Sequence, residues 1–167
     1  MISRARVQRM TLQTLMSYHR WATQRILETC AVLSSEEFLR DLGGSFKSVR
    51  DTLAHALMAD NAWLHRVRGE PFTRPTPEQL PADLETLRDQ WQDVLRDWEA
   101  LIATRGSSEL IQYRAFDGQP YSSRVDEIVW QVINHGSYHR GQVALMLRQL
   151  GHAAVGTDLI TFTRLPT

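Results

Sequence analysis

Residues 125–150 read VDEIVWQVINHGSYHRGQVALMLRQL, and this stretch decides the fold. Its apolar side chains return every three or four residues for about seven turns, the period of an amphipathic α-helix. Ser123 with Asp126 three residues later is typical of a helix start, and Gly151 is a typical C-cap. The apolar face consists of Val125, Ile128, Val129, Val132, Gly136, Val143, Met146, Leu147 and Leu150. We therefore predict one long helix that begins after Ser123, ends at Leu150, and needs other helices to cover this face.

Three further segments repeat the helical period, at residues 11–33, 48–68 and 82–104. A Gly-Gly-Ser stretch at 43–45 and a proline-rich stretch at 71–81 separate them. Four amphipathic helices of about 20 residues predict an all-α fold, a four-helix bundle. The long connections leave the up-down order of the helices open.

The pattern changes between residues 110 and 122, before the last helix. Asp117-Gly118 is a strong turn signal there, so we expect a short β-hairpin or an extended excursion. We expect the tail at 157–162 to pack along the bundle. The length of 167 residues predicts a single domain over residues 1–167.

The composition argues against two classes of partner. Nineteen basic and nineteen acidic residues balance to zero formal charge, which disfavours a nucleic-acid binder. No stretch approaches the roughly 18 consecutive apolar residues needed to cross a membrane, so no membrane partner is expected. The single cysteine, Cys30, excludes an internal disulfide and fits a reducing compartment. We expect a soluble, cytoplasmic protein.

Two histidines lie on the long helix at the spacing of a metal-binding pair. His139 falls within the apolar face and His135 at its edge one turn earlier, so both imidazoles could reach one ion. This pattern alone is weak, because a core-facing histidine is more often a hydrogen-bonded structural residue. Zinc peptidases carry Glu directly after the first histidine, but Gly136 occupies that position, so peptidase chemistry is not expected.

Other polar residues also face the predicted core. His55 lies on a flank of the second helix beside small residues, as on a pocket wall. His19 lies within the apolar face of the first helix, either as a structural residue or near the site as a fourth nitrogen. Asp60 faces inward and needs a partner, for which Arg140 is a candidate. Trp21 lies opposite its helix's apolar face, where the tail or a second subunit would cover it.

Two runs of sequence carry a resemblance to a known family. SFKSVRDTLAH at 45–55 and VINHGSYHRGQ at 132–142 resemble motifs of the DinB-like family. YHRWA at 18–22, LRQLG at 147–151 and Thr157-Asp158 add to the similarity, which spans almost the whole chain.

The resemblance implies a four-helix bundle, commonly a homodimer, that holds a divalent metal through three histidines. The matching positions are His55, His135 and His139. Family members have been associated with zinc, nickel and other divalent ions. Better characterised relatives are metal-dependent thiol-S-transferases or isomerases that activate a low-molecular-weight thiol. The resemblance implies neither DNA binding nor polymerase activity.

Two classes of function follow. Three imidazoles leave at least one coordination position open, as at a catalytic metal. The leading hypothesis is a metal-dependent transferase or hydrolase that acts on a small molecule, with a thiol as a candidate co-substrate. The alternative is a non-enzymatic, stress-related metal-binding or sensing protein.

Overall fold

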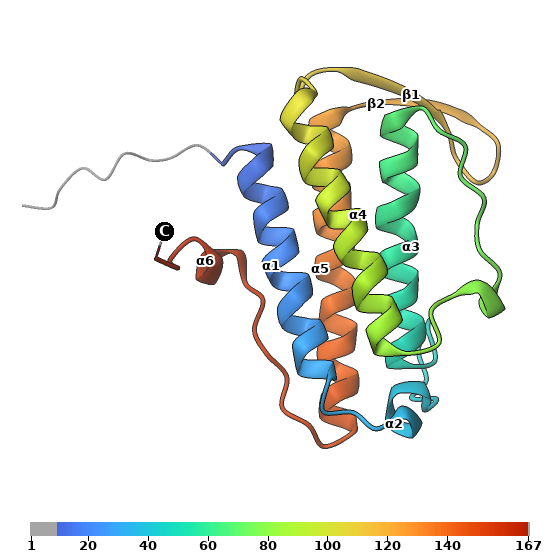
Figure 1. The fold of residues 1–167 in the computed structure, drawn as a ribbon, viewed down its shortest axis with the longest axis vertical. Coiled ribbons are helices and arrows are strands. Elements are labelled where there is room, and N and C mark those ends of the chain that lie inside the picture. The colour runs from blue at the N-terminus through green and yellow to red at the C-terminus, as the bar shows by residue number, and fades with distance from the viewer. Residues whose placement is uncertain (1–9, 167) are drawn as a thin grey trace, which may run out of the picture.

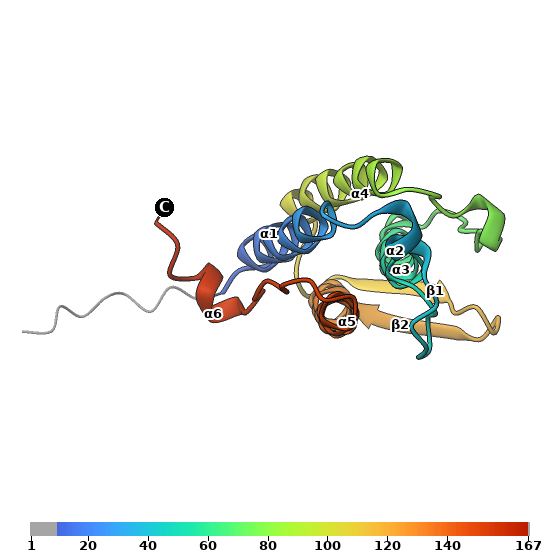
Figure 2. The same ribbon diagram turned by 90° about the horizontal axis from the view of Figure 1, so that it is seen from below.

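The computed structural model describes residues 10–166, and it is a bundle of four long helices (Figure 1). These helices are α1 (Leu12–Cys30), α3 (Val49–Arg68), α4 (Leu84–Thr104) and α5 (Val125–Gln149). Each packs on two others: α5 contacts α1 and α3, and α4 contacts the opposite sides of the same two helices (Figure 2). The predicted all-α fold with a hairpin before the last helix is confirmed.

The connection between α3 and α4 settles the order of the helices. Residues 69–83, with the short 3₁₀ helix η1 (Pro77–Gln79), return along the outside of the bundle, so α3 and α4 run in the same direction (Figure 1). Gly69 ends α3 in the left-handed conformation, with φ of 73°. Asp83 begins α4, because its carboxylate accepts a hydrogen bond from the backbone N–H of Thr86 at 2.8 Å.

The helix ends lie within two residues of the predictions except after α1, but α5 is capped by Arg124 with Glu127 and not by the predicted Ser123 with Asp126. The predicted segment 11–33 ends early, because Ser34 caps another helix, α2 (Ser35–Leu39). Ser34 and Glu37 form a capping box, in which each side chain accepts a hydrogen bond from the other residue's backbone N–H. A helix of five residues is too short to show a period in the sequence.

The hairpin lies where it was predicted. Strands β1 (Leu110–Arg114) and β2 (Pro120–Arg124) pair antiparallel, with Tyr113 opposite Tyr121. Gly118 has φ of 81°, the conformation that the Asp-Gly turn requires. The hairpin lies across one end of the bundle, where β1 contacts α3 (Figure 1).

The tail packs against α1, as predicted. Short helix α6 (Leu159–Phe162) contacts α1, and the Phe162 ring lies 5.6 Å from that of Trp21. The Tyr18 hydroxyl also donates a hydrogen bond to the carbonyl of Thr157 at 2.9 Å. The tail therefore covers Trp21 within this one chain.

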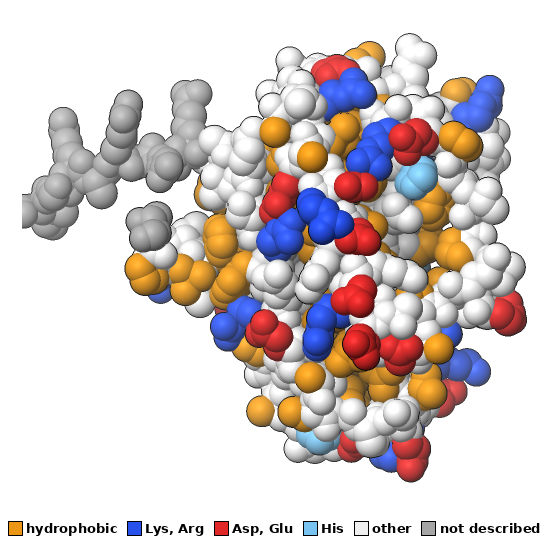
Figure 3. Space-filling model, viewed as in Figure 1, with side chains coloured by type: hydrophobic (Ala, Val, Ile, Leu, Met, Phe, Trp, Pro, Cys, Tyr) orange, Lys and Arg blue, Asp and Glu red, His pale blue; other side chains and the backbone are white. Residues whose placement is uncertain are grey.

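Charged side chains of both signs are interspersed over the face of the bundle seen in Figure 3. Within residues 10–166, none of the helices combines the length and the apolar character that a membrane-spanning helix needs.

Candidate metal site

Helices α3 and α5 bring His55, His135 and His139 together. The Nε2 atom of His135 lies 3.3 Å from Nε2 of His55 and 3.0 Å from Nε2 of His139. One ligand nitrogen from each ring falls within 4.8 Å of the other two, and the rings are partly or fully buried. His55 and His135 are 80 residues apart, yet all three histidines direct their Nε2 atoms to one point between the two helices.

The spacing of these nitrogens fits a shared cation. Two nitrogens bound to one tetrahedral zinc at about 2.0–2.1 Å lie about 3.3 Å apart. When neutral imidazoles direct unprotonated nitrogens at one another, the lone pairs on these nitrogens repel. A proton on one nitrogen can form a hydrogen bond across only one pair of nitrogens and leaves the other pair repelling. The donor set therefore fits a divalent metal of the kind that prefers imidazole.

Gln142 fixes the orientation of one of the three rings. The Nδ1–H of His139 donates a hydrogen bond to Oε1 of Gln142 at 2.7 Å, which leaves Nε2 with its lone pair directed at the other two histidines. Gln142 was missed from the sequence, although it lies one turn beyond His139 on the same face. Within residues 10–166, the buried Nδ1 of His135 has no hydrogen-bond partner.

The surroundings keep the three imidazoles neutral. Burial, followed by the charges of His139, His135 and Arg74, lowers the pKa of His55 to about 4. Burial is also the main cause that lowers the pKa of His135 and of His139. A metal binds only the neutral form of imidazole, so these shifts favour metal over protons.

Phe46 packs over the three-histidine group from the loop before α3. Its ring stacks on His55 with centroids 4.1 Å apart and meets the ring of His139 edge-on at 5.5 Å. A cavity of about 480 Å³ opens beside His55 and is also lined by Lys47, Arg50 and Arg74. The site therefore has adjoining space for a small molecule.

A second buried polar network lies behind the site, and it corrects one prediction. Asp60 does not pair directly with Arg140: its Oδ2 accepts hydrogen bonds from Nε2 of His19 and Nε1 of Trp91, each at 2.8 Å. Nη1 of Arg140 lies 3.3 Å from Nδ1 of His19, so His19 joins the two charged residues. Both nitrogens of His19 are thus occupied away from the three-histidine group, and His19 is a structural residue here.

Gly136 makes room for this network. A Cβ atom at this position would lie 2.5 Å from Cε1 of His19 and 2.9 Å from Nη1 of Arg140. The close approach of α1 to α5 thus explains a glycine in the middle of a helix. Nothing in the structure explains Gly141, whose Cβ would have no neighbour within 4 Å.

Fold and site together define a helical-bundle protein with three convergent histidines suited to a metal ion. The chain matches the model of the DinB family over residues 7–166, and it belongs to that family. It is 30% identical to Protein DinB of Bacillus subtilis (strain 168) over 152 residues, which cover 86% of this chain and 88% of the relative. It is 25% identical to the uncharacterized protein YizA of the same organism over 143 residues, covering 82% and 86%.

A solved structure supports the fold. The crystal structure of a DinB-like protein from Bacillus cereus ATCC 10987 superposes with a TM-score of 0.67 at 17% sequence identity. The match covers 89% of this chain and 99% of the other. At this identity the likeness concerns the fold alone.

Proposed function

We propose that the protein binds one divalent metal through His55, His135 and His139, and that it is a metal-dependent transferase or hydrolase acting on a small molecule. The observation that carries this proposal is the convergence of three Nε2 atoms. The Nε2 atom of His135 lies 3.3 Å from that of His55 and 3.0 Å from that of His139. Zinc and nickel are the first candidates, because both accept imidazole ligands. A metal held by three imidazoles lowers the pKa of a bound water or thiol and so supplies a nucleophile near neutral pH.

The chain's own residues prepare such a site. Gln142 holds His139 in the tautomer that leaves Nε2 free, and the Phe46 ring stacks on His55. The adjoining cavity carries three basic residues, Lys47, Arg50 and Arg74, against one acidic residue, Asp51. This balance favours an anionic small molecule. A low-molecular-weight thiol is our candidate co-substrate, on the strength of the family resemblance.

We also propose that the protein is a homodimer. Helix α5 exposes three large apolar side chains: Trp130 at 51%, Tyr138 at 63% and Leu145 at 57%. Exposed aromatic and aliphatic side chains along one helix are typical of a surface that a partner covers. Light scattering should give twice the chain mass, and a Trp130→Glu, Leu145→Glu variant should give the monomer mass with an unchanged helical signal.

The first test is the metal content of protein purified without a metal-binding tag. Elemental mass spectrometry should give about one zinc or nickel per chain, and His55→Ala and His139→Ala variants should lose it while circular dichroism stays helical. His65→Ala is the matched control, since His65 lies on α3 outside the group. A protein that takes up no metal after incubation with zinc or nickel would overturn the proposal.

The second test separates an enzyme from a binding protein. Metal-loaded protein is incubated with small thiols and electrophilic acceptors, and loss of free thiol is followed against the His139→Ala variant. Turnover that depends on the metal supports the transferase. Tight metal binding with neither turnover nor thiol binding would instead favour a metal-binding or sensing role.

A further inference from the structure

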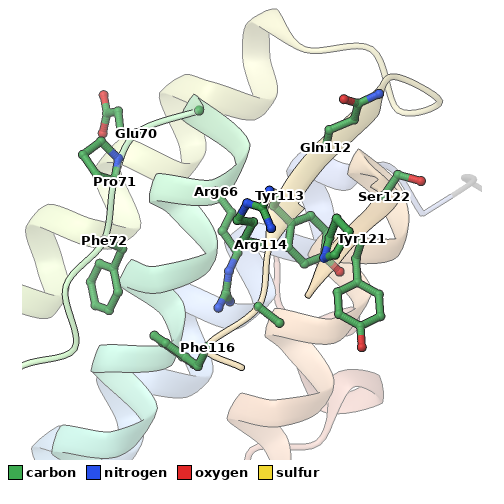
Figure 4. A pocket seen from close by; sticks show the side chains of 13 residues that line it. Arg66, Glu70, Pro71, Phe72, Gln112, Tyr113, Arg114, Phe116, Tyr121 and Ser122 are labelled. Carbon is green, nitrogen blue, oxygen red and sulfur yellow. The ribbon is translucent and has the colours of Figure 1, made fainter. Parts of the chain in front are cut away.

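A second cavity lies at the hairpin end of the bundle, away from the three histidines. Its volume is about 980 Å³, and the end of α3 with the following loop forms one wall while the hairpin forms the other (Figure 4). Arg66, which lines it, lies 11 residues after His55 on α3. That is about 16 Å along the helix, so Arg66 lies well away from the three histidines.

Arg66 occupies an unusual position in this cavity. Its guanidinium carbon lies over three aromatic rings, at 4.6 Å from the centroid of Trp63, 5.7 Å from Tyr113 and 4.7 Å from Phe116. In Figure 4 the side chain reaches from α3 toward Phe116, between Phe72 and the two hairpin tyrosines. The rings cover the faces of the guanidinium but accept nothing from its N–H groups, which point along its edges.

The N–H groups of Arg66 lack a counterion within residues 10–166. Glu70, the acidic residue of the cavity lining, forms no ion pair with Arg66, and its carboxylate lies 3.4 Å from Nδ1 of His65. Burial lowers the pKa of Arg66, in keeping with a side chain that the surrounding rings partly cover. A partly buried guanidinium with free N–H groups can hold a carboxylate through two parallel hydrogen bonds.

The other charged residues at the cavity do not act as a counterion for Arg66. Arg114 donates a hydrogen bond to the carbonyl of Gly118 at 2.8 Å and adds a positive charge to the hairpin wall. The guanidinium carbon of Arg74 lies 5.4 Å from the centroid of the Phe116 ring. Glu70 is the one acidic residue among those lining the cavity, against the two basic residues Arg66 and Arg114. The cavity is therefore both cationic and aromatic.

We propose that this cavity binds a small aromatic carboxylate, with the carboxylate on Arg66 and the ring among the side chains of Phe72, Phe116 and Tyr121. The volume lies in the range of small-molecule sites. The aromatic side chains offer stacking surfaces, and the guanidinium offers the single directional anchor. This site is independent of the metal and of the function proposed above.

The test uses metal-free protein, dialysed against EDTA, and follows 4-fluorobenzoate by fluorine NMR. The native protein should bind it, and Arg66→Gln should weaken binding at least about tenfold, because a charge-assisted hydrogen-bonded pair is lost. Arg68→Gln is the matched control: it removes one positive charge from the same helix outside the cavity and should change affinity less than about twofold. The His139→Ala variant should bind as the native protein does.

A second variant guards against misfolding. Phe116 is 53% exposed at the hairpin tip, so Phe116→Ala should leave the melting temperature unchanged and still weaken binding. Neutral 4-fluorobenzamide and non-aromatic acetate should each bind much more weakly than 4-fluorobenzoate. Equal binding by native and Arg66→Gln protein, equal binding of either comparison compound, or no binding by the native protein at about 10 mM ligand would overturn the proposal.

Discussion

Replacement of glycine by alanine should have opposite effects on stability at two positions of α5. Gly136→Ala would force a Cβ to within 2.5 Å of His19 and should destabilise the protein by about 1–3 kcal/mol, as overpacking does. Gly141→Ala meets nothing within 4 Å and should stabilise by about 0.5–1 kcal/mol, since alanine is the better helix former. Urea unfolding of both variants at neutral pH measures the difference. Two changes of the same sign would contradict the packing described for Gly136.

Asp60 is the acidic centre of the buried network. Its Oδ2 accepts hydrogen bonds from His19 and Trp91, and its backbone carbonyl accepts one from Nε1 of Trp98 at 3.1 Å. Asp60→Asn removes the charge that balances Arg140 and should cost about 3 kcal/mol of stability. Asp97→Asn is the control, because the exposed Arg68–Asp97 pair is worth under about 1 kcal/mol. Equal losses in the two variants, measured by urea unfolding, would show that the network contributes little.

Gln142 should matter for metal affinity more than for stability. Because it accepts the Nδ1–H of His139, Gln142→Ala frees the ring to rotate and should weaken zinc binding by about 10- to 100-fold. Competition with a chromophoric chelator measures the affinity. Gln149→Ala, at the exposed end of the same helix, is the control. Unchanged affinity in Gln142→Ala would remove this residue from the site.

The short helix α2 contributes a pH-dependent element of stability. A hydrogen bond from the backbone N–H of Ser34, then one from His152, lowers the pKa of Glu37 from its ordinary value of 4.5 to about 2. The folded state thus prefers the ionised form, so its stabilisation is complete above about pH 4.5 and disappears as the pH falls toward 2. Glu37→Gln keeps the capping geometry but lacks the charge. Native and variant proteins should therefore differ in urea midpoint at pH 6, differ less at pH 3, and converge near pH 2.

One outcome of this experiment would contradict the role assigned to the charge of Glu37. A difference between native and Glu37→Gln protein that persists undiminished at pH 3 would assign the effect to packing instead of charge. Glu36→Gln is the control, since Glu36 is exposed and, within residues 10–166, pairs only with Arg40, the C-cap residue of α2.

The long elements could be predicted from the sequence because their apolar periods extend over five or more turns. Gly118 and Gly151 also marked boundaries that depend on local backbone geometry, since both have a positive φ. The short α2 and α6 were missed because four or five residues cannot show a period. The crossover between α3 and α4 could not be predicted, since it depends on which faces pack together.

The candidate site, like the fold, could be predicted from the sequence only in part. Helical spacing indicated that His135 and His139 share a face, and the family resemblance added His55. The direction of Asp60 was predicted correctly, but its partner was not, because His19 on another helix intervenes between Asp60 and Arg140. Arg66 gave no signal in the sequence, since two of the three aromatic rings over it, Tyr113 and Phe116, come from the hairpin, far along the chain.

At the scale of the whole molecule, the three histidines join two helices that the chain connects only indirectly. His55 lies on α3 and the other two on α5, with the outer crossover, α4 and the hairpin between them in the sequence. A ligand shared by the two helices is bound by the folded state and not by the unfolded chain. Metal binding should therefore stabilise the bundle as a unit and not one helix.

Zinc at about 100 times its dissociation constant should add about 2.7 kcal/mol to the free energy of unfolding. For a chain of this size that corresponds to a rise of about 5–10 °C in melting temperature. Calorimetry of metal-free protein with and without zinc measures the rise, and it should increase with the logarithm of zinc concentration. His55→Ala removes the only ligand from α3, so the remaining pair on α5 can bind zinc without linking the helices, and the rise should largely vanish. An equal rise in His55→Ala would mean that zinc stabilises α5 alone, and that the three histidines do not act as one site.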